Sequence, residues 1–385
     1  MERFLCIHGH FYQPPRDDPW SGVIPYQESA EPFQNWNERI AKECYGANAN
    51  SRFLSSAGKI SDLVNNYRYI SFNIGPTLID WLAVYAPAVY NRILEADAWS
   101  VEAQGGHGNA IAQGYNHIIL PLAEPDEIRT QIRWGLRHFA HHFKRQSEGL
   151  WLPETAIDMT TAEILVQEGV KYAILSPWQC ESITEKDGKQ AFLDETPAPS
   201  HKCYRLPTPS GDLAVFFYNQ TLAQKISFEH YLHSADILYN SILSTFKGTE
   251  EGSLISIATD GEVYGHHEPF GDMCLAALIQ KILKGKTLEI INYGRYLELY
   301  PPAATVTLRK GEEEKGTSWS CHHGVSRWYK DCGCVTGGKP EWNQEWRTPL
   351  RNACNELWKE LKQVFLTEAP KLSTLPALEL RDRYI

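Results

Sequence analysis

The sequence predicts an α/β protein in which a barrel of seven β-strands with intervening helices precedes a smaller, mainly helical C-terminal subdomain. Short β-type runs alternate with longer segments of helical period, which is typical of a parallel sheet with crossover helices. The length of 385 residues suits one large α/β domain with an appendage. Pro301-Pro302 then interrupts the chain and Trp-rich sequence follows. We therefore expect a barrel over residues 1–300 and a Trp-rich, mainly helical subdomain over residues 301–385 that packs on it.

The strands are predicted from short apolar runs with β-type composition. They cover residues 4–7, 69–73, 99–103, 150–152, 172–175, 213–218 and 254–258. Between them, residues 126–143 carry apolar side chains at steps of three and four, and Asp126 and Glu127 suit the positive end of a helix dipole.

Further helices are predicted after Thr160, and near residues 236–246 and 272–283. Thr160 and Glu163 have the spacing of a capping box, and Gly169 is placed to end that helix. A last helix begins near Thr348 and Pro349, with Leu350, Cys354, Leu357, Leu361 and Phe365 on one face.

Charge and hydropathy exclude several classes of partner. The net charge is -10, and the chain has no run of basic residues, so nucleic acid and anionic membranes are poor candidates. The longest apolar region, residues 69–90, contains prolines and an Asp that prevent it from spanning a bilayer as one helix. The first residues lack the apolar segment of a signal peptide, so we expect a cytoplasmic protein whose nine cysteines are mostly free thiols.

The carboxyl ends of the predicted strands carry the polar residues. In a parallel barrel these ends form the active site. The candidates there are His8, His10, Gln13, His107, His117, Glu154, Asp260, Glu262 and His266. Glu154 and Asp260 are carboxylates that reach one rim from separate strands. Each could instead cap a helix or form an ion pair, but their joint placement favours a functional pair.

Two opposed carboxylates at a barrel mouth suit glycoside cleavage. One group acts as an acid and the other as nucleophile or base, while flat aromatic rings bind sugar faces. The chain has 12 Trp and 19 Tyr, and Trp178 follows a predicted strand end. We therefore expect Trp178 to contact substrate, and His8 and His10 to bind sugar hydroxyls or to hold the carboxylates.

Three segments resemble motifs of glycoside hydrolase family 57. Ile7-His8-Gly9-His10 leading to Gln13-Pro14 resembles the first motif, with Phe11-Tyr12 inserted. Residues 149–154, Gly-Leu-Trp-Leu-Pro-Glu, resemble the third, and residues 259–265, Thr-Asp-Gly-Glu-Val-Tyr-Gly, resemble the fourth. The resemblance implies a distorted TIM-like (β/α)7 barrel that acts on α-glucans with retention, with Glu154 as nucleophile and Asp260 as general acid/base.

The chain departs from the family pattern at the second motif. A Gly-Gln-x-Glu core is not present, although residues 115–122, Tyr-Asn-His-Ile-Ile-Leu-Pro-Leu, resemble the segment that follows it. Thr317-Ser318-Trp319-Ser320 stands in the place of the fifth motif, where an aromatic residue lines the substrate cleft. The resemblance thereby adds Trp319 to the expected substrate contacts.

Several functional alternatives remain open. Transfer of the glycosyl group to water would make the protein an α-amylase, and transfer to a glucan would make it a 4-α-glucanotransferase or a branching enzyme. A glycan-binding barrel without turnover is a second possibility. A metal-dependent amidohydrolase also carries His-x-His on its first strand, but it would need histidines after the fifth and sixth strands, where Trp178 and Asn219 stand. We therefore expect no cofactor and no catalytic metal, an oligo- or polysaccharide substrate, and an oligomeric state that the sequence leaves open.

Three cysteines of the predicted C-terminal subdomain could bind zinc or remain free thiols. Cys321, Cys332 and Cys334 lie close to His322 and His323 in the sequence, which suits a small zinc site, but they do not form two CxxC pairs. Structural zinc and free buried thiols both remain possible for them.

Overall fold

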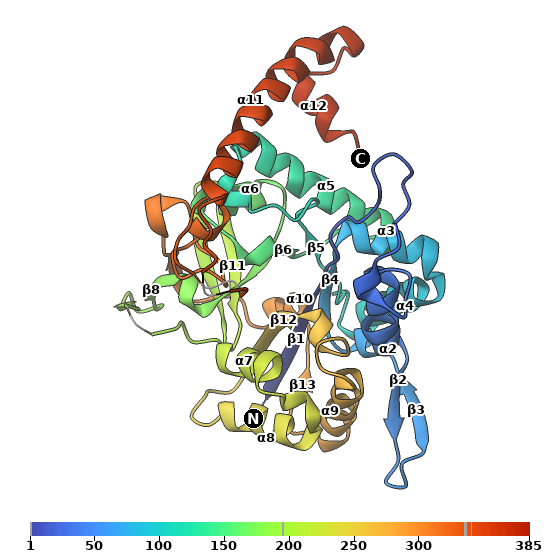
Figure 1. The fold of residues 1–385 in the computed structure, drawn as a ribbon. Coiled ribbons are helices and arrows are strands. Elements are labelled where there is room, and N and C mark those ends of the chain that lie inside the picture. The colour runs from blue at the N-terminus through green and yellow to red at the C-terminus, as the bar shows by residue number, and fades with distance from the viewer. Residues whose placement is uncertain (1, 195, 335–336, 340) are drawn as a thin grey trace.

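Seven parallel strands form the centre of the computed structural model, which describes residues 2–194, 196–334, 337–339 and 341–385 (Figure 1). The strands are β1 Arg3–Phe11, β4 Ser71–Ile74, β5 Ala112–Gln113, β6 Leu150–Trp151, β7 Tyr172–Leu175, β11 Gly211–Phe217 and β12 Ser253–Asp260. β1 lies between β12 and β4, and β11 pairs with β7, in each case in parallel. The predicted (β/α)7 barrel of distorted TIM-like type is confirmed.

The barrel is distorted because several of its strands are very short. β5 and β6 are two residues long, pair in parallel, and join their neighbours on both sides through isolated parallel bridges. β11 and β12 meet through a hydrogen bond from the backbone N–H of Asn219 to the carbonyl oxygen of Ser256, 2.7 Å long. The carboxyl ends of all seven strands therefore face the same side of the molecule.

The third predicted strand, residues 99–103, is wrong. These residues form the last turns of α4, Pro87–Ala103, and the third barrel strand is β5. The buried residues of α4 are Ile93, Ala96, Asp97 and Ser100, a spacing of three and four that identifies a helix face. Because two of the four are polar, hydropathy did not reveal this face.

Helices surround the barrel and those predicted from periodicity are confirmed. They are α1 Trp36–Ile40, α2 Gly46–Ala49, α3 Pro76–Tyr85, α4, α5 Pro125–Phe143, α6 Met159–Gln167, α7 Gln220–Phe228, α8 Ala235–Thr245, α9 Gly271–Gly285 and α10 Tyr293–Leu299. The cap of α6 differs from the prediction, since Asp158 rather than Thr160 accepts a hydrogen bond from the backbone N–H of Thr161.

Additional strands extend the barrel on one side. β8 Cys180–Thr184, β9 Gln190–Phe192, β10 Cys203–Thr208 and β14 Thr305–Leu308 join β7 and β11 in one six-stranded sheet of order β7-β11-β10-β14-β8-β9. Residues 301–385 thus contribute a strand to a sheet that contains two barrel strands. β13 Glu289–Ile290 pairs with β1, and β2 Ser51–Leu54 and β3 Ile60–Val64 form a separate hairpin.

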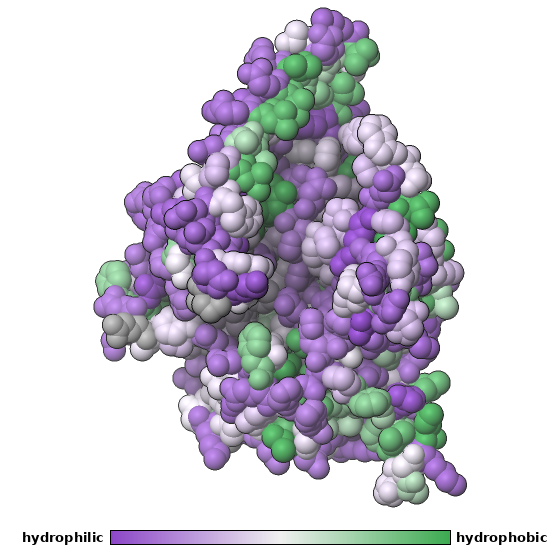
Figure 2. Space-filling view, in the orientation of Figure 1, coloured by the Kyte–Doolittle hydropathy of each residue, from purple (hydrophilic) through white to green (hydrophobic). Residues whose placement is uncertain are grey.

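The C-terminal helices are α11 Arg347–Leu372 and α12 Ala377–Asp382. α12 packs on α5, where the carboxylate of Asp382 accepts hydrogen bonds from Thr130 and Arg133 at 2.6 Å each. α11 projects from the body of the molecule, and its apolar side chains are visible as a green band in Figure 2. Leu350, Leu357 and Leu361 are more than half exposed rather than packed against the barrel. No helix in the described ranges is long and apolar enough to cross a membrane.

Candidate active site

A cavity of about 590 Å³ lies at the carboxyl ends of the barrel strands, where Figure 2 shows the surface hollowed. Glu154, which follows β6, and Asp260, the last residue of β12, both line it. Other lining residues are Tyr218, Gln220, Phe228, Trp319, Ser320, Arg327, Trp328 and Arg347. The structure therefore brings the two predicted catalytic carboxylates to one cavity, from strands on different parts of the barrel.

The backbone at Glu154 has an uncommon conformation. Its φ of 60° and ψ of 18° lie in the left-handed region, and Thr155 follows with a φ of 51°. Non-glycine residues adopt this conformation infrequently, because it costs of order 1 kcal/mol or more, and strained residues of this kind cluster at functional sites. Gln179 fixes this turn: its amide donates to the carbonyl oxygen of Thr155, and its Oε1 accepts from the Thr155 hydroxyl, each at 2.9 Å. The turn directs the Glu154 side chain into the cavity.

Two donors from the C-terminal region contact the carboxylate of Glu154. Trp319 Nε1 donates to Oε2 at 2.9 Å, and the Ser320 hydroxyl donates to the same oxygen at 2.6 Å. The backbone N–H of Trp319 also donates to the carbonyl oxygen of Glu154, and Thr317 forms an antiparallel bridge with Ile157. The segment that follows β14 therefore runs alongside Glu154 and supplies the partners of its side chain.

Asp260 has an environment different from that of Glu154. Asp260 lines the cavity and is exposed to it, while the protein atoms around its carboxyl group reduce the hydration of the charged form. Burial, and secondarily the charge of Glu154, raise the pKa of Asp260 from 3.8 to about 6. The next residue must be glycine, because a Cβ at Gly261 would lie 2.3 Å from the ring of Phe11. The two carboxyl groups of the cavity therefore have different surroundings.

Glu262, two residues after Asp260, is buried and does not line the cavity. Its Oε1 accepts hydrogen bonds from the Tyr45 hydroxyl at 2.6 Å and from the backbone N–H of Tyr12 at 3.2 Å. Burial, with a smaller contribution from the charge of Asp260, raises the pKa of Glu262 from 4.5 to about 7. Gln13 is also buried and donates to the oxygen of Tyr45 at 2.8 Å. Gln13 and Glu262 were both expected to bind substrate. Instead they form buried hydrogen bonds with Tyr45 and do not line the cavity.

His8 and His10 are buried near the cavity and are not among the residues that line it. His8 is completely buried, with Nδ1 3.0 Å from the Ser71 hydroxyl and Nε2 3.1 Å from Asn73 Oδ1. Burial lowers the pKa of His8 to about 3 and holds that of His10 well below its usual value, so both are neutral. Both rings stack on Trp151, with centroids 4.9 and 5.0 Å away. The pair therefore fixes the strand that leads into Glu154.

His117 completes this aromatic stack. Its Nε2 lies 3.1 Å from Nε2 of His10, and its ring lies on that of Tyr12 with centroids 3.9 Å apart. Two nitrogens at this distance share one proton, so at least one ring is neutral. Burial lowers the pKa of His117 to about 4 against the opposing charge of Glu154, so His117 lies within the electrostatic reach of that carboxylate.

Three of the expected contacts lie farther from the carboxylates. Trp178 is 40% exposed and donates through Nε1 to Gln220, which lines the cavity. His266 is held by Glu43 at 2.6 Å on the side of α1. His107 bonds to Glu148, which precedes β6, at 2.8 Å and therefore lies at the amino ends of the strands. Its placement near the cavity depended on the incorrect strand 99–103.

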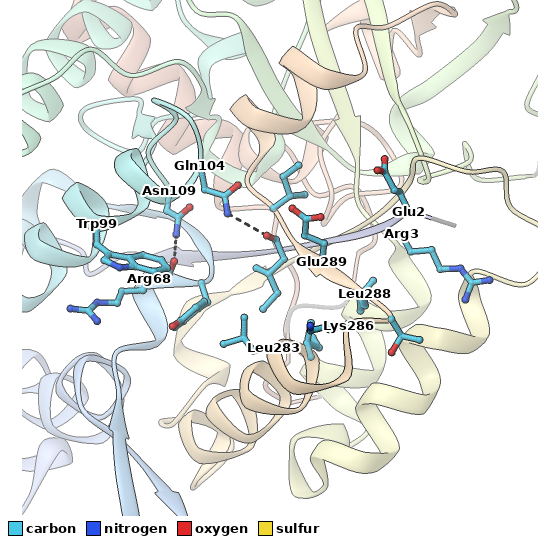
Figure 3. Close-up of a pocket in the computed structure, with 15 residues that line it drawn as sticks. Glu2, Arg3, Arg68, Trp99, Gln104, Asn109, Leu283, Lys286, Leu288 and Glu289 are labelled. Atoms are coloured by element: carbon cyan, nitrogen blue, oxygen red, sulfur yellow. Dashed lines mark hydrogen bonds between the residues drawn. The ribbon is translucent and has the colours of Figure 1, made fainter.

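A second cavity, of about 470 Å³, occupies the opposite end of the barrel (Figure 3). Arg3, at the start of β1, and Glu289, in β13, line it. Two hydrogen bonds drawn there join side-chain amides to backbone carbonyls, from Gln104 to Ile290 at 3.3 Å and from Asn109 to Arg68 at 2.9 Å. These bonds connect structural elements. Because active sites of such barrels lie at the carboxyl ends of the strands, the first cavity is the candidate active site.

Sequence reasoning missed several residues of the site. Ser320, Arg327 and Arg347 come from the region after the barrel, and no pattern of spacing relates them to a strand end. Trp151 belongs to the segment 149–154 that was singled out, but its place beneath His8 and His10 became visible only in three dimensions. Three groups of possible metal ligands occur among the described residues, and neither His8 nor His10 belongs to one of them.

Comparisons with known proteins agree with this architecture. A search of curated proteins found no match. The chain is similar in structure to the exo-type maltose-forming amylase from Pyrococcus sp. ST04, with 16% identity, a TM-score of 0.70, and coverage of 96% of this chain and 64% of that one. It is also similar to the 4-alpha-glucanotransferase from Thermococcus litoralis, with 16% identity, a TM-score of 0.58, and coverage of 80% and 42%.

A third solved structure, the GH57-type branching enzyme from Pyrococcus horikoshii, has 15% identity, a TM-score of 0.60, and coverage of 84% of this chain and 75% of that one. At these identities the likeness concerns the fold. The chain spans less than two thirds of the amylase and of the glucanotransferase.

The family assignment comes from the sequence itself. Residues 342–385 match a domain of unknown function, DUF3536. The sequence model of glycosyl hydrolase family 57 matches residues 17–309, a span that contains both Glu154 and Asp260. Because this match covers more than half of the chain, the protein belongs to glycosyl hydrolase family 57.

Proposed function

We propose that the protein is a retaining enzyme acting on α-glucans, with Glu154 as nucleophile and Asp260 as general acid/base. The observation that supports this most directly is the difference between the two carboxylates of one cavity. Glu154 has two hydrogen-bond donors on its carboxylate, while the pKa of Asp260 is raised to about 6. Covalent glycoside cleavage requires one carboxylate positioned for attack and one carboxyl group suited to hold a proton.

The hydrogen bonds assign separate roles to the two oxygens of Glu154. Trp319 and Ser320 both donate to Oε2, so Oε1 is the oxygen available to attack the anomeric carbon. As the carbon–oxygen bond to Glu154 forms, Asp260 gives its proton to the departing glycosidic oxygen. Asp260 then takes a proton from the acceptor, which displaces Glu154 from the glycosyl-enzyme.

The acceptor decides the reaction class. Water gives hydrolysis, whereas a glucan hydroxyl gives transfer, and the choice depends on how well an acceptor sugar excludes water from the cavity. The proposal covers both outcomes. The amylase, glucanotransferase and branching enzyme with similar folds are named for reactions of this kind.

The test is incubation with maltoheptaose followed by sizing of the products. Shorter sugars alone mean hydrolysis, and longer sugars mean transfer. Glu154→Gln should abolish both, and Asp260→Asn should spare only substrates with good leaving groups, such as an α-maltosyl fluoride. With that fluoride, Asp260→Asn should accumulate a glycosyl-enzyme, detected by mass spectrometry on the peptide that contains Glu154.

Glu95→Gln is the matched control, because Glu95 is an exposed carboxylate on α4 that does not line the cavity. It should leave the product pattern unchanged. Normal activity of folded Glu154→Gln would refute the assignment. Binding of maltoheptaose without any change in its length would favour a glycan-binding barrel that lacks turnover.

A further inference from the structure

Four potential metal ligands converge immediately after the residues that contact Glu154. The Sγ atom of Cys321 lies 3.9 Å from that of Cys332 and 3.9 Å from that of Cys334. Nδ1 of His323 lies 3.5 Å from Cys334 Sγ. All four ligand atoms are within 4.8 Å of one another, although they come from two segments about ten residues apart in the sequence.

These distances match a tetrahedral zinc site. Zinc binds thiolate sulfur at about 2.3 Å and imidazole nitrogen at about 2.0 to 2.1 Å, so tetrahedral geometry separates neighbouring ligand atoms by about 3.5 to 3.8 Å. The separations of 3.5 and 3.9 Å are close to this range. Three cysteines and one histidine form a ligand set typical of structural zinc.

A disulfide explains the cluster less well. Cys321 is equally distant from Cys332 and Cys334, so a disulfide with either would leave the other thiol unused, whereas a metal ion uses both. Gly333 separates the two in a left-handed conformation, with a φ of 78°. Nothing lies within 4 Å of the position that a Cβ would take there, so this glycine serves the backbone turn between the two thiols rather than close packing.

We propose that Cys321, His323, Cys332 and Cys334 bind one zinc ion in a closed structural site. Four protein ligands leave no open position for water or substrate, so the ion takes no part in bond cleavage. Its role is to hold together a segment with little regular structure. In the described part of residues 309–346 the regular elements are two three-residue helices, Glu312–Glu314 and Ser326–Trp328, and one β-bridge.

The packing around this segment is also limited. Val325 forms a small cluster with Ile119 and Ala156 apart from the main core, and Trp319, partly buried, packs against a second cluster through Trp151. Segments that bury little apolar surface commonly depend on a metal or a disulfide for their stability. The zinc site would add stability around the four ligands, where few apolar side chains are buried.

The site is connected to the cavity by the chain itself. Ser320, whose hydroxyl contacts Glu154, immediately precedes Cys321. Arg327, which lies between the two halves of the ligand set and lines the cavity, donates to the carbonyl oxygen of Ser320 at 2.7 Å. Bound zinc would thus position the donors to the nucleophile. This consequence rests on the proposed function, whereas the zinc site itself does not.

Metal content tests the proposal. The protein purified from zinc-supplemented medium should hold one equivalent of zinc that resists brief dialysis against EDTA, as measured by elemental mass spectrometry. Cys332→Ser and Cys334→Ser should lose it. Cys354→Ser is the matched control, because Cys354 is an exposed thiol on α11 outside the cluster, and it should retain the full equivalent.

Spectra of bound Co²⁺ distinguish this site from the two other candidate groups. One consists of Asp80, His138 and His142, and the other of His230, His233 and Glu268. Neither contains sulfur. Titration of the metal-free protein with Co²⁺ should give a thiolate-to-cobalt charge-transfer band together with the intense visible bands of tetrahedral cobalt, saturating at one equivalent. The bands should be absent in Cys332→Ser. This measurement needs no substrate, so it distinguishes failure of the zinc site from failure of the proposed function.

The expected catalytic effect is a several-fold fall in kcat of Cys332→Ser, against complete loss in Glu154→Gln. Wild-type protein without zinc that shows no cobalt–thiolate band would overturn the proposal. So would unchanged zinc content in Cys332→Ser, or a disulfide found within the cluster by mass spectrometry. If the serine variants do not fold, the cobalt titration of the metal-free wild type decides between the outcomes.

Discussion

Trp319 donates a hydrogen bond from its indole Nε1 to Oε2 of Glu154 over 2.9 Å, across 165 residues of sequence. The two residues come from different parts of the chain: Glu154 follows barrel strand β6, and Trp319 follows β14. The position of the proposed nucleophile therefore depends on the region after the barrel. This contact leads to the first of four predictions.

Trp319→Phe should keep the aromatic wall of the cavity and remove the donor to Glu154. A hydrogen bond to a charged group contributes about 1.5 to 3 kcal/mol, so kcat should fall about tenfold to 150-fold with little change in Tm. Steady-state kinetics on maltoheptaose and a thermal melt check this. Trp20→Phe, which alters an almost fully exposed Trp, should have no effect. An unchanged kcat in Trp319→Phe would show that the hydrogen bond does not matter for catalysis.

The activity should depend on pH through Asp260. Because its pKa is raised to about 6, Asp260 loses its proton above that pH, and kcat/KM should decline as the pH rises through about 6. The charge of Glu154 contributes to this pKa, so Glu154→Gln should lower the pKa of Asp260, as measured by carbon-13 NMR of the carboxyl groups. A pH profile that stays flat to pH 9 would contradict the role of Asp260 as the acid.

Glu262→Gln should stabilise the fold at alkaline pH. The pKa of Glu262 is raised from 4.5 to about 7, so the folded state binds this proton more tightly than the unfolded state, and stability is lost as the pH rises from about 4.5 through 7. Gln keeps an acceptor for Tyr45 and carries no charge. The free energy of unfolding should increase by about 1 to 3 kcal/mol at pH 8 and change little at pH 4. Urea unfolding at both pH values measures this, and equal effects at pH 4 and 8 would contradict it.

Trp178→Ala should weaken glucan binding more than it weakens the fold. The side chain is 40% exposed and its indole N–H contacts Gln220 at the cavity, a placement suited to stacking on a sugar. Loss of one aromatic contact should cost about 1 to 2 kcal/mol of binding free energy, or roughly 5- to 30-fold in Kd. Calorimetric titration with maltoheptaose measures the affinity. A fall in Tm of many degrees with unchanged affinity would instead identify Trp178 as a core residue.

The sequence by itself determined the elements whose signals are local. β7 is a short apolar run whose four residues are all buried, and α5 buries one face at three- and four-residue spacing, so the pattern alone identified both. The strand-end positions of Glu154 and Asp260 followed from the same patterns. By contrast, β5 is two residues long and carries too little pattern to detect, and α4 buries Asp97 and Ser100, which concealed its helical face.

Only the tertiary structure decided which residues surround the carboxylates. Parallel strands bring their carboxyl ends together whatever their separation in sequence, so the pairing of Glu154 with Asp260 could be expected from topology. The family resemblance placed Trp319 in the cleft, but neither its hydrogen bond to Glu154 nor the positions of Ser320 and Arg327 had such a basis. These residues lie on an irregular segment whose path is set by long-range contacts with the barrel. The sequence predicted which groups carry the proposed chemistry. Packing between distant segments determined their partners, their hydrogen bonds and the pKa of Asp260, because these depend on distances in space rather than on neighbours along the chain.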